Sequence, residues 1–189
     1  MDTIDKGTTS PIEARRLPTW VIILAFALLL GFLAILALGL RRTMQGPITV
    51  GQNVPAFSIE TFDRKTINTA DLAGKVIVVN FWASWCKPCE QEADELEMAW
   101  LKYQPGGKVV FLGLAYVDTE PNSLEYMRKF KITYPNGPDL ETKVSQMFRI
   151  RGVPETYIIA PNGTLAYVKI GPFTSLGEII SIIDPLIAK

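Results

Sequence analysis

The sequence predicts a three-layer α/β domain, with a central mixed sheet covered by helices on both faces, behind a single membrane-spanning helix. Residues 75–83 form a continuous apolar run, which is typical of a strand buried on both faces of a sheet. After this run, helical and strand patterns alternate and end in an antiparallel hairpin and a helix. Ahead of the domain stand 21 uncharged residues, 20–40.

The uncharged stretch is long enough to cross a bilayer. As a helix it would span about 31 Å, against a hydrocarbon core of about 30 Å. Arginine pairs bracket it, and Trp20 stands at one edge as an interfacial anchor. It exceeds the apolar core of a signal peptide, although cleavage after Ala37 or Gly39 remains an alternative. Three basic residues precede it and two follow closely, which slightly favours a cytoplasmic N-terminus.

The chain is therefore expected to have four parts. Residues 1–18 are a short, disordered cytoplasmic tail, and residues 19–41 are the transmembrane anchor. Residues 42–56, which contain glycines and prolines, are a linker. Residues 57–189 are the folded domain, on the extracytoplasmic side of the cell membrane.

The elements of the domain follow from apolar periodicity and from glycine and proline breaks. In chain order we expect strands at 57–60 and 65–68, a helical turn at 69–72, the buried strand at 75–83, a helix at 86–103, a strand at 108–116, helices at 123–131 and 140–148, and hairpin strands at 155–160 and 164–170. Asn162-Gly163 is the hairpin turn, and the capping box Ser175–Glu178 opens a last helix. The peptide Asn136-Gly137-Pro138-Asp139 leads into the helix at 140.

The helix at 86–103 has one apolar stripe, which predicts the face turned to the core. Its members are Ala93, Leu96, Trp100 and Leu101. Three acidic residues are then expected on a solvated face: Asp94, Glu95 and Glu97.

Composition excludes several functions. The formal net charge is zero, so nothing indicates a nucleic-acid surface. The chain has no histidine, which excludes Cys–His and Ser–His–Asp catalysis, haem held by histidine and most catalytic metal sites. We expect no metal and no nucleic-acid partner.

The two cysteines, Cys86 and Cys89, are the only ones in the chain and stand at a predicted helix start. Thiols at this spacing can form a disulfide, and the helix dipole stabilises a thiolate there. This pattern favours thiol–disulfide exchange. Zinc shared with a second chain, an inert structural disulfide and two buried unreactive thiols remain as alternatives.

Four motifs together resemble the TlpA/ResA/CcmG family of membrane-anchored, thioredoxin-like thiol–disulfide oxidoreductases. They are Val50-Gly51-Gln52, Asp71-Leu72-Ala73-Gly74-Lys75, Asn80-Phe81-Trp82-Ala83-Ser84-Trp85-Cys86-Lys87-Pro88-Cys89 and Gly152-Val153-Pro154-Glu155-Thr156. The resemblance covers about residues 50–187. It implies a thioredoxin fold with an added N-terminal hairpin and an insertion around residues 117–138.

The resemblance also implies roles in the reaction. Cys86 matches the exposed attacking cysteine, Cys89 the buried resolving cysteine, and Pro154 a cis-proline facing them. The backbone of Val153 is then expected to pair with an extended substrate. The rest of the expected substrate groove is Trp85, Lys87, Pro88 and Glu155, with Trp82 packing beneath.

Two polar positions bear on proton transfer. Ordinary thioredoxins carry a buried aspartate where this chain has Asn80, which cannot accept a proton in that way. Glu92 matches the glutamate that the resembled family uses near its cysteines. A carboxylate beside a buried thiol can take its proton, although its charge also raises the pKa of the thiol. A solvated helix glutamate is the alternative for Glu92, and a strand-edge residue is the alternative for Glu155.

The family implies an extracytoplasmic reductase without a cofactor beyond the Cys86–Cys89 disulfide. Its expected substrates are the haem-site cysteines of apocytochromes c, and its expected electron donor is a membrane thiol transporter like CcdA or DsbD. Reduction of other exported proteins, including copper-site assembly factors, is the alternative within this chemistry. A peroxiredoxin relative is less favoured because Ala83 stands where that class needs threonine. A redox-inert, anchored binding module is the alternative from another class.

Overall fold

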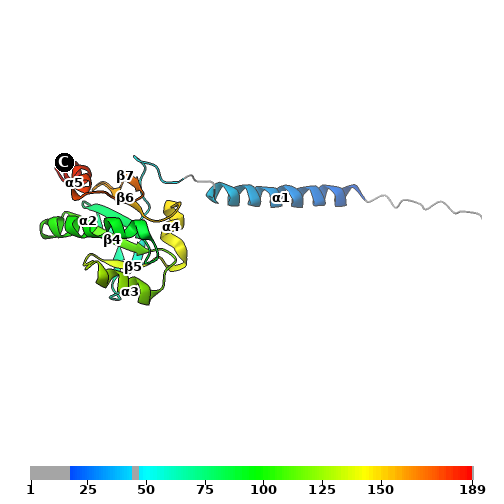
Figure 1. Cartoon of the computed structure of the whole chain (residues 1–189). Helices are drawn as coiled ribbons and strands as arrows, with labels where there is room; N and C mark the ends of the chain where they lie inside the picture. Colours follow the sequence, from blue (N-terminus) through cyan, green and yellow to red (C-terminus); the bar gives the residue numbers. More distant parts are fainter. Residues whose placement is uncertain (1–17, 44–46, 189) are drawn as a thin grey trace, which may run out of the picture. The chain divides into compact units, whose positions relative to one another are not determined.

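The computed structural model describes residues 18–43 and 47–188, and the chain divides into two units, Met1–Gly46 and Pro47–Lys189 (Figure 1). In the first unit the described element is helix α1, Thr19–Thr43. Its segment Thr19–Leu36 is long and apolar enough to cross a membrane, by length and composition. The expected tail lies almost wholly outside the described residues.

The second unit is built on a mixed sheet of five strands in the order β5-β4-β3-β6-β7. Strand β3, Val76–Trp82, is central and every residue in it is buried. It runs parallel to β4, Val109–Ala115, and antiparallel to β6, Glu155–Ile159. The predicted hairpin pairs β6 with β7, Leu165–Ile170, across the Asn162-Gly163 turn.

Helices cover both faces of this sheet, so the three-layer prediction is confirmed (Figure 1). One face packs against α2 (Lys87–Tyr103), α3 (Glu120–Lys129) and α5 (Leu176–Ile187). The other packs against α4 (Lys143–Phe148) and the N-terminal hairpin of β1 (Ser58–Glu60) and β2 (Thr66–Asn68). Short 3₁₀ turns occupy Thr69–Leu72, Gln104–Gly106 and Leu140–Thr142.

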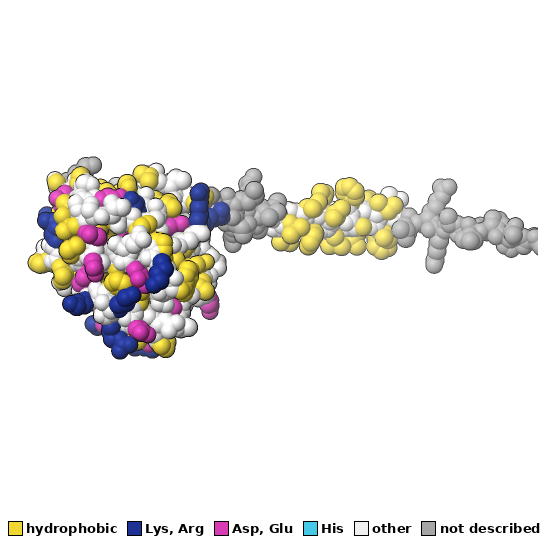
Figure 2. All heavy atoms as spheres, viewed as in Figure 1, with side chains coloured by type: hydrophobic (Ala, Val, Ile, Leu, Met, Phe, Trp, Pro, Cys, Tyr) yellow, Lys and Arg dark blue, Asp and Glu magenta, His cyan; other side chains and the backbone are white. Residues whose placement is uncertain are grey.

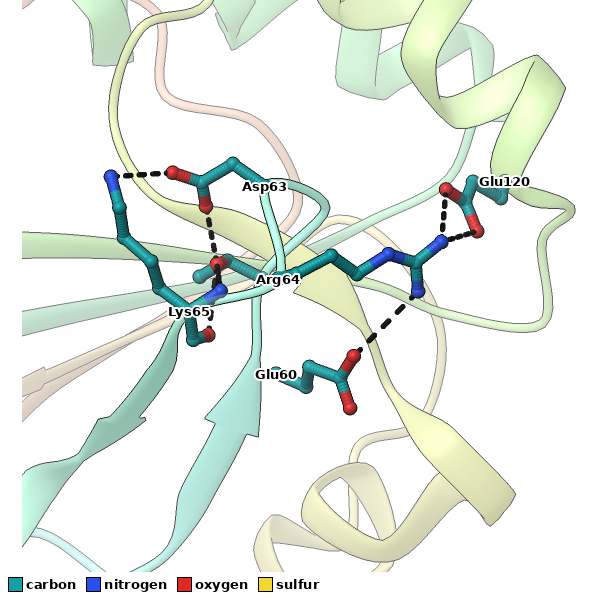
Figure 3. Close-up of polar contacts among 6 residues, drawn as sticks. Glu60, Asp63, Arg64, Lys65 and Glu120 are labelled. Atoms are coloured by element: carbon teal, nitrogen blue, oxygen red, sulfur yellow. Dashed lines mark hydrogen bonds and ion pairs between the residues drawn. The ribbon is translucent and has the colours of Figure 1, made fainter.

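The turn of the N-terminal hairpin is tied to the insertion. Arg64 places one guanidinium nitrogen 2.9 Å from Glu120, at the start of α3, and another 3.6 Å from Glu60 (Figure 3). The backbone N–H of Phe62 also donates to the carbonyl of Asn136 at 2.8 Å. The ion pairs are exposed and stabilise little, so the backbone contact is the firmer link.

Strand β5, Asn136–Pro138, was not predicted. Its Asn-Gly-Pro sequence reads as a turn, yet it pairs in parallel with β4 and forms the sheet edge. Gly137 makes this possible, because a Cβ there would stand 2.1 Å from the backbone oxygen of Glu60. The long-range fit against β1, rather than local propensity, therefore decides the conformation.

The predicted helix at 140–148 is interrupted. Glu141 and Thr142 have positive φ angles of 56° and 55°, so a 3₁₀ turn precedes a short α4. Asp139 stabilises the break by accepting hydrogen bonds from the backbone N–H groups of Val144 and Ser145.

Two predictions on the face of α2 were wrong. Leu101 is 53% exposed, whereas Glu97 is 7% exposed. Glu97 accepts a 2.8 Å hydrogen bond from the backbone N–H of Thr133 and another from its hydroxyl. This carboxylate fastens the loop after α3 to α2, which apolar periodicity cannot reveal.

The expected linker is partly folded. The N–H groups of Gly51 and Val54 donate to the carbonyls of Leu165 and Gly163, and Asn53 forms a β-bridge with Thr164. The folded unit therefore begins at Pro47, ahead of the expected boundary at residue 57.

Candidate active site

The two cysteines form a disulfide at the N-terminus of α2. Cys86 is the N-cap residue, and its sulfur accepts a hydrogen bond from the N–H of Cys89 at 3.2 Å. The same N–H groups and dipole that hold a neutral sulfur here stabilise a thiolate after reduction. Cys86 is 4% exposed and Cys89 is 1% exposed. The expected open exposure of Cys86 is thus not seen in this oxidised form.

The loop before the disulfide is fastened to the loop after β4. The N–H and hydroxyl of Ser84 donate to the Asp118 carboxylate at 2.7 and 2.9 Å. The indole N–H of Trp85 donates to the carbonyl of Val117 at 3.1 Å. Trp85 is 58% exposed and Val117 62%, so both offer apolar surface next to the cysteines. Asp118 and Val117 were not predicted, because only the fold brings them beside Ser84 and Trp85.

Charges around the start of α2 partly compensate each other. Lys87 and Pro88 are exposed, and the Lys87 ammonium lies 3.0 Å from Glu90. Lys129 of α3 lies 3.2 Å from the same carboxylate. These two cations, Lys87 first, lower the pKa of Glu90. Lys87 and Lys129 thus offset the negative charge of Glu90 near Cys86, which would otherwise disfavour a thiolate there.

Pro154 lies at the edge of the sheet where the CxxC loop leaves β3. Its peptide bond with Val153 is cis. The next residue, Glu155, pairs with Phe81 near the end of β3, which places Pro154 at that edge. Val153 is half-buried and contacts the apolar clusters on both faces.

Glu155 supports this loop from within. It is 2% exposed and accepts hydrogen bonds from the N–H groups of Arg151 and Gly152, at 2.8 and 3.3 Å. The hydroxyl of Tyr157 donates to its other oxygen at 2.7 Å. Glu155 therefore holds the backbone before Pro154 rather than lining an open groove with its carboxylate.

Glu92 is buried one helical turn after Cys89, on the same face of α2. It is 1% exposed, and its oxygens accept hydrogen bonds from Asn80 Nδ2 at 2.8 Å and from the N–H of Phe173 at 2.9 Å. Burial raises the pKa of Glu92 to about 7, with the two hydrogen bonds opposing the rise. The solvated alternative for Glu92 is wrong: this carboxyl can exchange a proton near neutral pH beside the cysteines.

The described residues contain no group of three or more Asp, Glu or Cys side chains that could hold a metal ion. The reactive group that the geometry presents is the Cys86–Cys89 disulfide. Its neighbours are a titratable carboxyl, an exposed apolar rim and the loop of Pro154.

Comparison with known proteins agrees with this site. Residues 50–168 match the AhpC/TSA family. The thiol-disulfide oxidoreductase ResA of Oceanobacillus iheyensis is 30% identical over 129 residues, which cover 66% of this chain and 67% of the relative. The thioredoxin-like protein YneN of Bacillus subtilis is 31% identical over 130 residues, covering 67% of this chain and 75% of the relative.

Solved structures show the same fold. A thiol:disulfide interchange protein of the thioredoxin family from Chlorobium tepidum superposes with a TM-score of 0.66 at 27% identity, covering 75% of this chain and 99% of that chain. The chain belongs to the AhpC/TSA family and has a thioredoxin-like domain. With its redox-active cysteine pair, it is a thiol–disulfide oxidoreductase of the ResA type.

Proposed function

We propose that this oxidoreductase is anchored by α1 and works outside the cytoplasm as a reductase of exported proteins, with the haem-site cysteines of apocytochrome c as its main substrate. The observation that supports exchange chemistry is Glu92, buried one turn from Cys89, whose pKa burial raises to about 7. The resemblance to the TlpA/ResA/CcmG family favours the reductive direction. An oxidising compartment is where a tethered dithiol reductase has work to do.

In the first step, the thiolate of Cys86 attacks one sulfur of a substrate disulfide. A Cys86–substrate disulfide forms, and the second substrate sulfur leaves as a thiolate that takes a proton. Cys86 is assigned this role because it caps α2 and therefore meets the helix N-terminus directly.

In the second step, Cys89 resolves the mixed disulfide. Glu92 accepts the proton of the Cys89 thiol, and the resulting thiolate attacks Cys86. The Cys86–Cys89 disulfide forms and the substrate leaves as a dithiol. Two electrons have passed to the substrate, and a membrane thiol transporter like CcdA or DsbD restores the dithiol.

The surface around the disulfide suits an extended, unfolded segment. Trp85 and Val117 are exposed apolar residues, and the loop of Pro154 lies at the same edge of the sheet. Acidic and basic side chains are interspersed on the visible face of the folded unit, which gives no strong field for a charged partner (Figure 2). The resemblance to the TlpA/ResA/CcmG family favours apocytochrome c as the source of such a segment.

The test compares oxidised substrates with the full chain in lipid nanodiscs. The substrates are a peptide with an oxidised Cys-x-x-Cys-His site, its scrambled control with the same disulfide spacing, and insulin. A rate for the first peptide about tenfold above both others supports apocytochrome c, since this corresponds to about 1.4 kcal/mol of discrimination. Equal rates support a general reductase of exported proteins, including copper-site assembly factors. No reaction with any of them contradicts the reductase proposal.

The membrane arrangement is tested by labelling in cells. Under reducing conditions, a membrane-impermeant thiol reagent should modify Cys86 in intact cells. Modification only after lysis would place the domain in the cytoplasm. A variant with both cysteines replaced by serine is the control for background labelling.

A further inference from the structure

A row of polar residues crosses the sheet beneath Glu92. Asn80 on β3 pairs in register with Thr156 on β6, and Thr156 pairs with Lys169 on β7. Directly opposed residues point to the same face of a sheet, so all three lie on the face that α2 covers. The Asn80 amide donates both to Glu92 and to the Thr156 hydroxyl, at 2.8 and 2.9 Å.

Lys169 ends this row with an ion pair to Glu178, at the start of α5. The two side chains are only 21% and 24% exposed. The Lys169 ammonium also lies 5.5 Å from the centre of the Phe173 ring. This pair therefore stands against the residue whose N–H binds Glu92.

The loop between β7 and α5 is held at two points. The N–H of Phe173 donates to Glu92, and the N–H and hydroxyl of Thr174 donate to Glu178, at 3.0 and 3.1 Å. Phe173 and Thr174 are consecutive in this short loop, so the loop links the carboxylate of Glu92 to the carboxylate of Glu178.

Charged side chains on β7 and α5 change the pKa of Glu92. Burial is the main cause of its raised pKa, Lys169 on β7 lowers that pKa, and Glu178 on α5 raises it. Two phenols also lie near Glu92: Tyr126 on α3 and Tyr134 in the loop after α3. Burial is the main cause that raises the pKa of each phenol, and the charge of Glu92 is the second. The phenols stay neutral at physiological pH, so Lys169 and Glu178 are the charged groups that act on Glu92.

We propose that Lys169 and Glu178 are positioning residues for the exchange reaction, which hold the loop that binds Glu92 and set by their opposed charges how readily Glu92 takes the proton of Cys89. The inference rests on the proposed role of Glu92. The ammonium favours the charged form of Glu92 and the Glu178 carboxylate opposes it, so each partner acts on proton transfer in its own direction.

The experiment uses the opposite signs of the two charges. Lys169→Met keeps the side-chain length and Glu178→Gln keeps its shape, and both remove the same ion pair. The reduced full chain in nanodiscs is mixed with an aromatic disulfide in a stopped-flow instrument, and the slower phase, resolution by Cys89, is followed from pH 5 to 9. The pH midpoint of this phase should rise by about half a unit in Lys169→Met and fall by a similar amount in Glu178→Gln.

Three variants serve as controls. Lys169→Arg keeps the charge and should keep the wild-type midpoint. Lys143→Met with Glu141→Gln removes an exposed ion pair at the start of α4 and should also keep the wild-type midpoint. In a Glu92→Gln background, Lys169→Met should cause no further shift, because the group that it acts on is gone.

The outcomes distinguish failure of the role proposed for Lys169 and Glu178 from failure of the role proposed for Glu92. Midpoints that move in the same direction in both single variants, or that do not move, overturn the inference. If the ion pair were purely structural, removing either partner would have the same effect on the midpoint. If Glu92→Gln itself keeps the wild-type midpoint, Glu92 is not the proton acceptor and the proposed mechanism fails first. Thermal unfolding of each variant verifies that the comparison is made on folded protein.

Discussion

Asn80 donates a 2.8 Å hydrogen bond to Glu92 inside the core, joining the middle of the sheet to the first turns of α2. Ordinary thioredoxins are expected to have a carboxylate at the first of these positions. Here the amide holds a carboxylate that comes instead from the helix of the cysteines. The proposed proton acceptor, Glu92, and the thiol of Cys89 therefore lie on the same helix.

Replacement of either cysteine should separate the two steps of exchange. Cys86→Ser should abolish reaction with a substrate disulfide, because the attacking thiolate is lost. Cys89→Ser should accumulate a mixed disulfide through Cys86, visible by mass spectrometry of the intact protein. Normal turnover by Cys89→Ser, or first labelling of Cys89 by a limiting amount of alkylating reagent, would reverse the assignment.

Glu92 should make the stability of the oxidised protein depend on pH. Its pKa is about 7 in the folded protein, against an ordinary value of 4.5, so the unfolded chain releases this proton first as pH rises. The stabilisation is thus complete below about pH 4.5 and is lost as pH rises through about 7, by about 3 kcal/mol at most. Urea unfolding of wild type and Glu92→Gln at pH 5 and 8 should show this loss in the wild type alone.

A control for this pH dependence lies on the same helix. Glu95 is more exposed than Glu92, and Glu95→Gln should leave the wild-type pH dependence in place. In Glu92→Gln, the new amide can turn a donor toward the N–H of Phe173, which costs stability at every pH. The difference between pH 5 and 8 is therefore the relevant quantity, and an unchanged difference in Glu92→Gln would mean that Glu92 is ionised throughout.

Truncation of Glu155 should loosen the loop that precedes Pro154. Glu155→Ala leaves the N–H groups of Arg151 and Gly152 and the Tyr157 hydroxyl without this buried acceptor. We expect a loss of about 2 to 4 kcal/mol in the free energy of unfolding, measured in urea. The exposed Glu141→Ala is the control and should change stability little. A loss no larger than this control would show that water replaces the carboxylate.

A methyl group at Gly137 should disturb the sheet edge. The new Cβ would lie 2.1 Å from the Glu60 carbonyl oxygen, so β5 or β1 must move. Gly137→Ala should lower the stability by about 2 kcal/mol or more. Gly177→Ala is the matched control in α5, where the nearest atom is the Ser175 hydroxyl oxygen at 3.9 Å, and it should stabilise by up to about 1 kcal/mol. Equal thermal midpoints for the two variants would contradict the close approach of β5 and β1.

Much of the fold could be predicted because its signals are local. The buried run of β3, the Asn162-Gly163 hairpin and the Ser175–Glu178 cap each depend on a few neighbouring residues. The disulfide pair and its place at a helix start are likewise a matter of spacing. Strand β5 escaped prediction because its Asn-Gly-Pro sequence favours a turn, and only packing against Glu60 and pairing with β4 overcome that preference.

The acidic residues of α2 show most clearly which properties sequence periodicity predicts and which depend on the fold. Periodicity along the chain sets helical neighbours, so it was enough to predict that the cysteines and the carboxylates share one helix. The burial of Glu92 and Glu97, in contrast to the exposure of Asp94, depends on long-range packing that periodicity does not reveal. Their partners, Phe173 and Thr133, lie 81 and 36 residues away. Burial and hydrogen bonding set the proton affinity of a carboxyl, and both are properties of the assembled fold.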